Sequence, residues 1–424
     1  MAGPVPENTT DTDDAVRTLL AFLGAAMVAT GQPVCDVEDE LTEVSVALGY
    51  PDVQIAAAPT GLTLNLASGQ PATYESVNGQ LRLDQAAEVR RIRYQLAHGL
   101  VSVSQAQADL LSLRDQPPRY PAWLANLGWI GIATGIALIL QPGWANVAFA
   151  AVGAVVVIFL FRMGQRFSLI ATLLPTLAAF SLACLVFAAA NAGWVEGPLR
   201  TLLPPLAVLL PGALLVTAMS ELAAGDMVAG SSRLVFGLVQ LLLFTLGIVA
   251  ATRVVPIAAG ELTNVRVDEL GWWAAPVGLV LISIGIGVLE SPPLRLLPWI
   301  SLGLVLAFVA QTLGQHLGGA TLGSFLGALA ASLGASLVEA IKPTLPRMVV
   351  FLPSFWLLVP GSLGLVSTTQ LAVNPAGEGA NAVGVVSVVC AIALGLLVGA
   401  AVARSIRGAV GRIRPRVKKT SFVL

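Results

Sequence analysis

The chain has 424 residues, with 23 Lys and Arg, 24 Asp and Glu and a formal net charge of −1; 56% of it is hydrophobic and 11% is charged. A soluble globular protein carries about 25% charged residues, because its surface must be wetted. These figures exclude a chain that is soluble throughout. They also disfavour a nucleic-acid-binding protein, since no strongly basic stretch appears before residue 404.

Charge divides the chain into two parts. Residues 1–122 hold 15 acids and 7 bases, whereas residues 123–424 hold 9 acids and 16 bases. The difference indicates an acidic, water-soluble domain followed by a part that meets lipid. Cys35, Cys184 and Cys390 stand far apart, so the sequence predicts neither a disulfide framework nor a zinc cluster, and we expect no metal and no cofactor. No signal peptide is recognisable, and we expect the first domain to stay in the cytoplasm.

Residues 13–119 are predicted to form a small cytoplasmic α/β domain behind a disordered segment at residues 1–12. Apolar spacing and turn signals indicate two helices, then a small antiparallel sheet with two hairpins, then two more helices. Asn78-Gly79 suits the second hairpin, because both turn positions need positive φ. The expected helices cover residues 12–30, 34–48, 84–98 and 104–114, and the expected strands cover residues 53–58, 62–67, 72–77 and 80–83.

Acidic side chains gather on the second predicted helix, around Glu38. They could ligate a metal or serve as an acid and base pair, but the pattern favours a solvated helix face with favourable charge near its N-terminus. Glu38 is kept as the candidate of this domain. His98 and the arginines Arg90, Arg91 and Arg93 are read as ordinary surface residues.

The remainder of the chain reads as ten transmembrane helices, several of them shorter than the ~20 residues that a perpendicular span needs. The predicted spans cover residues 123–140, 144–161, 169–189, 203–222, 234–251, 271–289, 296–313, 322–337, 349–366 and 383–402. With both termini in the cytoplasm, 15 Lys and Arg lie inside and three, Arg200, Arg253 and Arg266, lie outside. This distribution obeys the positive-inside rule.

An internal repeat relates the fourth and ninth predicted spans. At an offset of 149, seven of twenty positions are identical, among them Pro211 with Pro360 and Gly212 with Gly361. Because the copies are offset by five spans, an odd number, the second must enter the membrane from the opposite side. The sequence therefore predicts a polytopic α-helical membrane protein built as a 5+5 inverted repeat, an arrangement typical of secondary transporters. Its parts are a first repeat at 120–255, a loop at 256–270, a second repeat at 271–403 and a basic cytoplasmic tail at 404–424.

A Pro-Gly pair inside an apolar span removes a backbone donor, so both repeat helices should break there. Backbone groups freed at that depth must line a cavity or find neighbours, which favours a substrate site over a simple packing kink. Glu221 is a candidate proton-coupling group, although it lies near the inner end of its span and could simply face water. The candidate substrate-binding residues are Pro211, Gly212, Thr217, Ser220, Pro360, Gly361, Ser362, Ser367, Thr368 and Gln370.

The stretch from Gly31 to Glu38, the membrane entry from Pro117 to Trp123 and the two Leu-Pro…Pro-Gly segments resemble the threonine/serine exporter family. The resemblance implies ten spans, a cytoplasmic N-terminal domain and export of L-threonine and L-serine driven by the proton motive force. It also implies that the two five-span halves can occur as separate polypeptides. Asp36 stands where the family's Gly-x-x-x-x-Arg-Val-Glu stretch commonly has Arg.

We therefore expect a secondary active transporter of the cytoplasmic membrane rather than an enzyme. Its expected partners are a small amino acid, protons and the lipid bilayer, without nucleic acid, and it could form a homo-oligomer. No Walker A segment is present in the sequence, so the chain does not itself power transport by ATP hydrolysis. The alternatives are an exporter of other small organic acids such as dicarboxylates, or a membrane-anchored hydrolase or sensor acting through the N-terminal domain.

Overall fold

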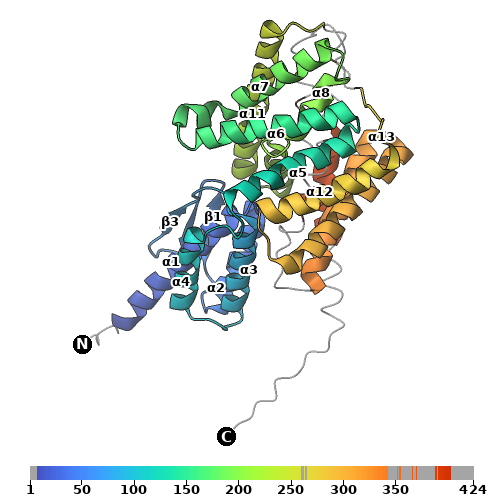
Figure 1. The fold of residues 1–424 in the computed structure, drawn as a ribbon. Coiled ribbons are helices and arrows are strands. Elements are labelled where there is room, and N and C mark those ends of the chain that lie inside the picture. The colour runs from blue at the N-terminus through green and yellow to red at the C-terminus, as the bar shows by residue number, and fades with distance from the viewer. Residues whose placement is uncertain are drawn as a thin grey trace, which may run out of the picture.

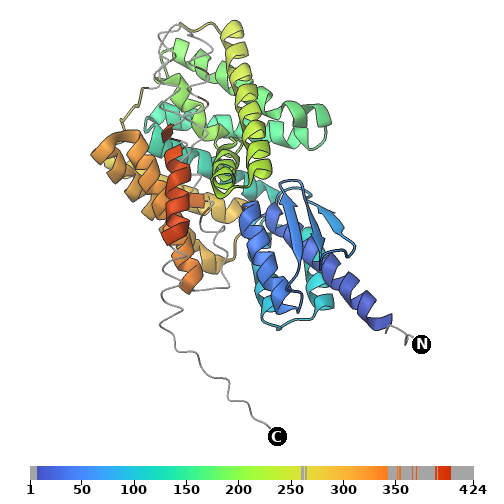
Figure 2. The same ribbon diagram turned by 180° about the vertical axis from the view of Figure 1, so that it is seen from behind.

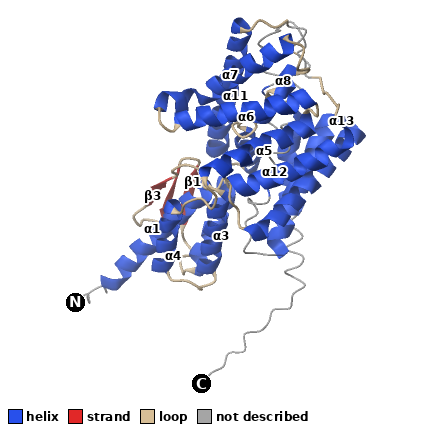
Figure 3. Cartoon of the chain, in the orientation of Figure 1, coloured by secondary structure: helices blue, strands red, loops and turns tan. Residues whose placement is uncertain are grey.

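The structure is a computed structural model that describes residues 7–258, 262, 265–341, 351, 353–354, 365, 369, 387–388 and 390–402. A small region of helices and strands at the N-terminus lies at one end of a bundle of long helices (Figure 1). Within the described part of the chain, strands occur only in that N-terminal region (Figure 3). The fold is therefore mostly helical.

The N-terminal region packs four helices against a three-stranded sheet. Its core is formed by the apolar faces of α1 and α2, the inward residues of β2 and the inner faces of α3 and α4. Leu62 and Leu64 of β2 are fully buried because β2 is the central strand. The elements are α1 (Glu7–Ala29), α2 (Val34–Ala47), β1 (Gln54–Ala58), β2 (Gly61–Asn65), β3 (Thr73–Ser76), α3 (Leu83–Ala97) and α4 (Val103–Asp115).

The sheet is antiparallel in the order β1-β2-β3, and its first hairpin falls where the sequence predicts it. The second predicted hairpin is wrong. The strand expected at residues 80–83 does not form, because β3 pairs with β2 and Leu81 N–H instead donates to Ala29 O at the end of α1 (2.9 Å). Arg82 is the N-cap of α3, and its own N–H donates to the Gln85 side chain (3.0 Å), a capping interaction that stabilises the start of the helix.

Six of the described helices are long and apolar enough to cross a membrane. Large hydrophobic side chains such as Phe159, Leu169 and Leu242 are exposed on them, as expected of a surface that faces lipid. Five match predicted spans directly, and the sixth covers two. These helices are α5 (Ala122–Leu140), α6 (Trp144–Gly164), α7 (Ser168–Asn191), α11 (Met227–Val254), α12 (Ala274–Leu289, extended by a 3₁₀ turn at Gly271–Trp273) and α13 (Leu297–Ile341, preceded by a 3₁₀ turn at Leu294–Leu296).

Helix α13 contains the seventh and eighth predicted spans. Its backbone leaves helical geometry at Gly318 and Gly319, the latter with φ of 78°, a conformation that glycine adopts without strain. Beyond this point the chain returns, because a Cβ built on Gly323 would touch Gln311 and Gln315 of the first arm. The two arms therefore form a hairpin of antiparallel helices, drawn in orange in Figure 2.

Helices α5 and α12 cross at very short distance through two pairs of glycines. A Cβ built on Gly135 would lie 2.6 Å from Gly278 O, and one built on Gly278 would lie 2.6 Å from Gly135 O. Gly128 and Gly285 make the same reciprocal approach at 2.8 and 2.6 Å. Small residues at these four positions let the two backbones touch. The same helices run antiparallel, since the earlier glycine of one meets the later glycine of the other.

The chain that follows α11 lies across the turn between α5 and α6. Gln141 in this turn is fully buried. Its Nε2 donates to Glu196 O (3.2 Å) and Val265 O (3.0 Å), and its Oε1 accepts from Val267 N–H (3.2 Å). One amide side chain thus ties together three segments at the end of the bundle that is remote from the N-terminal region.

Candidate functional site

The fourth predicted span is broken in the structure, as its sequence predicts. Its residues form α9 (Leu203–Leu206) and α10 (Gly212–Ala224), and the short helix α8 (Pro198–Thr201) lies directly before it. Pro211 stands before α10 with ψ of 30°, outside helical geometry, and it has no N–H to give to the preceding turn. The first N–H groups of α10 therefore point back into the irregular segment between the two helices.

The break lies inside the protein. Pro211 and Gly212 are buried. Val208, Leu209 and Leu210 pack against the cluster that contains Leu365, the described residue beyond the Pro-Gly pair of the ninth predicted span. The irregular segment thus meets the interior of the bundle rather than lipid.

Only part of the predicted substrate site falls in the described residues. Thr217 and Ser220 are half-buried on α10. They lie about 7 Å and about 12 Å along the helix from Gly212, at 1.5 Å per residue. The other candidates, which belong to the ninth predicted span, lie outside the described residues: Pro360, Gly361, Ser362, Ser367, Thr368 and Gln370.

Glu221 lies apart from the break. It stands nine residues after Gly212, which places it about 14 Å further along the helix. The side chain has 0% exposure, and its Oε2 lies 3.2 Å from Nε of Arg233 on α11, which is itself 8% exposed. The expectation that Glu221 could simply face water is therefore wrong. A buried ion pair between α10 and α11 takes its place.

The second carboxylate oxygen of Glu221 reaches the N-terminal region. Its Oε1 accepts the backbone N–H of Val34, the first residue of α2, at 3.0 Å across 187 positions of sequence. Cys35, next along α2, hydrogen-bonds to Asp226 in the turn between α10 and α11. Burial, then the charges of Asp36 and Asp226, raises the pKa of the Cys35 thiol to about 12. The Gly31 to Glu38 stretch therefore docks on the α10–α11 turn.

Glu38 has a structural partner. Its Oε1 accepts the backbone N–H of Ala57 at 2.8 Å, on the outer side of the edge strand β1. Burial raises the pKa of the Glu38 carboxyl, and this hydrogen bond opposes the rise. The arrangement satisfies an edge N–H that no neighbouring strand can reach.

The other charged residues of the N-terminal region mostly pair with each other. Arg90 and Arg93 lie 3.1 and 3.0 Å from the carboxylate of Glu40, joining α3 to α2. His98 stacks on Tyr94, with ring centroids 4.0 Å apart. Among the residues that the structure describes, no group of three or more His, Cys, Asp or Glu side chains could hold a metal ion.

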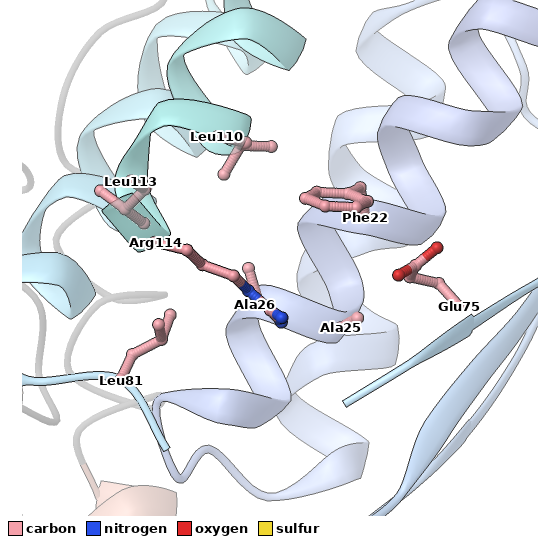
Figure 4. A pocket seen from close by; sticks show the side chains of 8 residues that line it. All are labelled: Phe22, Ala25, Ala26, Glu75, Leu81, Leu110, Leu113 and Arg114. Carbon is pink, nitrogen blue, oxygen red and sulfur yellow. The ribbon is translucent and has the colours of Figure 1, made fainter. Parts of the chain in front are cut away.

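A shallow pocket of the N-terminal region lies between α1, α4 and β3 (Figure 4). Glu75 and Arg114 line it together with apolar residues such as Phe22 and Leu113. It has room for about one water molecule, so the pocket is too small for an amino acid.

Glu290, at the end of α12, also reaches the N-terminal region, and sequence patterns could not have identified its partner. Its carboxylate accepts a hydrogen bond from the backbone of Leu83, the first residue of α3. Arg82 and Asp84 stand close enough to act on it electrostatically, and burial raises the pKa of its carboxyl. Leu83 and Ala86 pack beside it into the apolar cluster of α5, α12 and α13.

A bundle of long apolar helices with a broken helix at its centre defines a multi-pass membrane protein. Residues 18–255 match the model of the threonine/serine exporter family. The match spans more than half of the chain and runs from α1 to the end of α11. The chain belongs to this family.

Two curated proteins resemble it. A probable threonine/serine exporter of Mycobacterium tuberculosis is 27% identical over 268 residues, covering 62% of this chain and 50% of the relative. A threonine/serine exporter of Corynebacterium glutamicum is 26% identical over 278 residues, covering 62% of this chain and 54% of the relative. The chain thus spans about half the length of these relatives. No solved structure matches it.

Proposed function

We propose that the protein is a secondary active transporter that exports small hydroxy amino acids, L-threonine and L-serine, across the cytoplasmic membrane. The observation that carries the proposal is the buried break at Pro211–Gly212 within the segment that matches the exporter family. Broken helices at membrane depth are the typical substrate sites of secondary transporters, because their free backbone groups can bind a polar ligand.

The proposed architecture is two inverted halves, and the α5–α12 crossing supports it. At an offset of 150, Gly128 corresponds to Gly278 and Gly135 to Gly285. If a two-fold axis relates the two helices, a contact between Gly135 and Ile282 must be matched by an equivalent contact between Gly285 and Ile132. Both contacts are observed, at 2.8 and 2.7 Å from the built Cβ. Six of the 19 positions of α5 are identical to their equivalents at this offset: Trp123, Ala125, Gly128, Ile132, Gly135 and Ile136.

A second pair of helix contacts supports the same symmetry. A Cβ on Gly247 of α11 would meet the backbone of α7 at Thr176 and Phe180 and the side chain of Ala179. A Cβ on Gly395 would meet Phe325, Leu329 and Ala328 of α13 in the same manner. The offsets are 148 and 149, close to the offset of the Pro-Gly repeat. The family match also ends at residue 255, where the proposed first half ends.

Within this architecture, the N-terminus of α10 would hold the carboxylate of the amino acid, because helix N–H groups and the helix dipole favour an anion. Thr217, about 7 Å along the helix, would accept or donate to the substrate hydroxyl or ammonium. Ser220 and Glu221 continue the same helix toward the N-terminal region. We propose ten spans with both termini in the cytoplasm, in agreement with the distribution of Lys and Arg.

For proton coupling we propose Glu221, acting at the inner end and not in contact with the bound substrate. Protonation of this carboxylate would remove the charge that holds Arg233, and a buried arginine without its partner is costly. The ion pair can therefore transmit a protonation event to the relative position of α10 and α11.

The test is release of labelled substrate from reconstituted vesicles, with L-threonine, L-serine and dicarboxylates compared in parallel. We expect L-threonine and L-serine to leave faster than from protein-free vesicles, and equal release of every compound would refute a carrier of amino acids. Gly212→Val should slow release at unchanged abundance. Gly334→Val is the matched control, because a Cβ there meets only Leu306, at 3.9 Å.

A further inference from the structure

Two helices of the N-terminal region have their first residue hydrogen-bonded to a carboxylate of the membrane part. The N–H of Val34, the first residue of α2, donates to Glu221 (3.0 Å), and the backbone of Leu83, the first residue of α3, donates to Glu290. A helix N-terminus carries partial positive charge, so each contact joins a negative side chain to the positive end of a helix. The same chemistry therefore anchors the region at two separate points.

Both anchors are buried, and apolar packing accompanies the second. Val34 is 1% exposed, and Leu83 is 3% exposed in a cluster with Ile286 of α12 and Ile300 of α13. The contacts thus belong to a docked surface and are not isolated hydrogen bonds. In Figure 2 the N-terminal region, in blue, meets the ends of both the yellow-green α11 and the gold α12.

The two anchors belong to different halves of the proposed carrier. Glu221 and its partner Arg233 join α10 to α11 in the first half, whereas Glu290 ends α12, the first helix of the second half. A rigid body attached to both halves at one end holds those ends at a fixed separation. Rocking of the halves, which alternating access requires, would have to break or stretch one of the anchors.

We infer that the N-terminal region is a clamp that holds the inner ends of the two halves together, and that it must release Glu221 or Glu290 before the inner side of the carrier can open. This inference rests on the proposed function and deepens it by assigning a role to residues 7–115.

Charges at the first anchor make it releasable. Asp36, Glu38 and Asp226 surround the docked N-terminus of α2, and Asp36 and Asp226 act on both Cys35 and Glu221. Arg233 opposes them from α11. At the second anchor Arg82 opposes Asp84 and Glu290. Acids that repel one another across the docked surface weaken it.

The test uses the full-length protein in lipid nanodiscs and compares wild type with Glu221→Gln/Glu290→Gln. Cys35 reports docking in a background carrying Cys184→Ala and Cys390→Ala. Undocking hydrates the thiol, so its alkylation should accelerate about tenfold for each pKa unit that it recovers. Spin labels at Ala224→Cys and Leu294→Cys, both exposed near the anchors, report the separation of the halves in a background without the native cysteines.

Glu269→Gln is the matched control. Its carboxylate also accepts the N–H of the first residue of a helix, Trp144 of α6, at 3.1 Å, but it lies on the chain that crosses the α5–α6 turn. We expect faster alkylation and longer spin-label distances in the double variant, and neither change in the control. Elution of all proteins as the same monodisperse species shows that the variants fold.

The outcomes separate the clamp from the transport activity. Unchanged alkylation of Cys35 would show that the negative charges of the two glutamates do not hold the region, which overturns the clamp. Faster alkylation with unchanged spin-label distances would show that the region docks without restraining the halves, which also overturns the clamp. Neither readout needs a substrate, so a failure of wild-type protein to release amino acids would count against the proposed function alone.

Discussion

Two junctions join distant parts of this molecule, and one is held by apolar packing whereas the other is held by polar contacts. At the α5–α12 crossing, Gly135 and Gly278 bring two backbones into contact among apolar neighbours. At the N-terminal region, Glu221 and Glu290 meet helix N-termini. A close-packed apolar contact loses stability when a larger side chain is added, whereas a polar contact can be exchanged for hydrogen bonds to water. In the proposed carrier, the first junction is therefore suited to be a pivot, and the second is suited to be a contact that opens and closes.

The largest effect is expected from Glu221→Ala, which attacks the polar junction. It leaves Arg233 buried without its carboxylate, which should destabilise the protein by about 3–5 kcal/mol. Thermal unfolding in detergent, followed by tryptophan fluorescence, measures the change. Glu269→Ala is the control. A similar loss of stability in both variants would show that the Glu221–Arg233 pair contributes no more to stability than Glu269 does.

Gly135→Val attacks the apolar junction. The added side chain meets Gly278 O and Ile282, and overpacking of this kind costs about 1–3 kcal/mol. We expect a lower unfolding temperature together with unchanged alkylation of Cys35, because the N-terminal region stays docked. Gly131→Ala, whose Cβ would lie 3.7 Å from Leu281 O, should behave as wild type. Equal stability of the valine variant and wild type would argue against the close crossing.

The smallest effect is expected from Asp36→Asn, which removes one repelling charge from the docked surface. The pKa of Cys35 is raised from 9.0 to about 12, so the docked state favours the protonated thiol and loses stability as pH rises through this window. Asp36 contributes less to the rise than burial does, so the pKa in Asp36→Asn should fall only part of the way. The rate of iodoacetamide labelling against pH measures it, and an unaltered profile would place Asp36 away from the thiol.

Local and periodic features of the structure could be predicted from the sequence. Hydropathy located α5, α6, α7, α11 and α12, because lipid imposes long apolar runs. The Pro211-Gly212 pair predicted a break, because proline cannot continue the hydrogen-bond ladder. The hairpin of β1 and β2 followed from its turn residues. The prediction of a hairpin at Asn78-Gly79 was wrong, because Leu81 bonds to the end of α1 and Arg82 caps α3.

The junctions could not be predicted in this way. Val34 and Glu221 are 187 positions apart, and no local pattern marks an amide as the partner of a distant carboxylate. The sequence around Gly278 and Gly285 does not show that these glycines meet α5, because the contact joins two helices far apart in the chain. The predicted half of the site around Pro360 and Gly361 lies outside the described residues and stays a prediction.

The proposed carrier and the proposed clamp both need two inverted halves, and the sidedness of equivalent positions decides whether the halves are inverted. Ala122 and Trp272, which is 87% exposed, are equivalent at the offset of 150 and begin the two halves. In intact cells with a background free of native cysteines, a membrane-impermeant maleimide should label Trp272→Cys from outside. If the halves are inverted, Ala122→Cys is labelled only after the membrane is permeabilised. Labelling of both positions from the same side would contradict an inverted repeat.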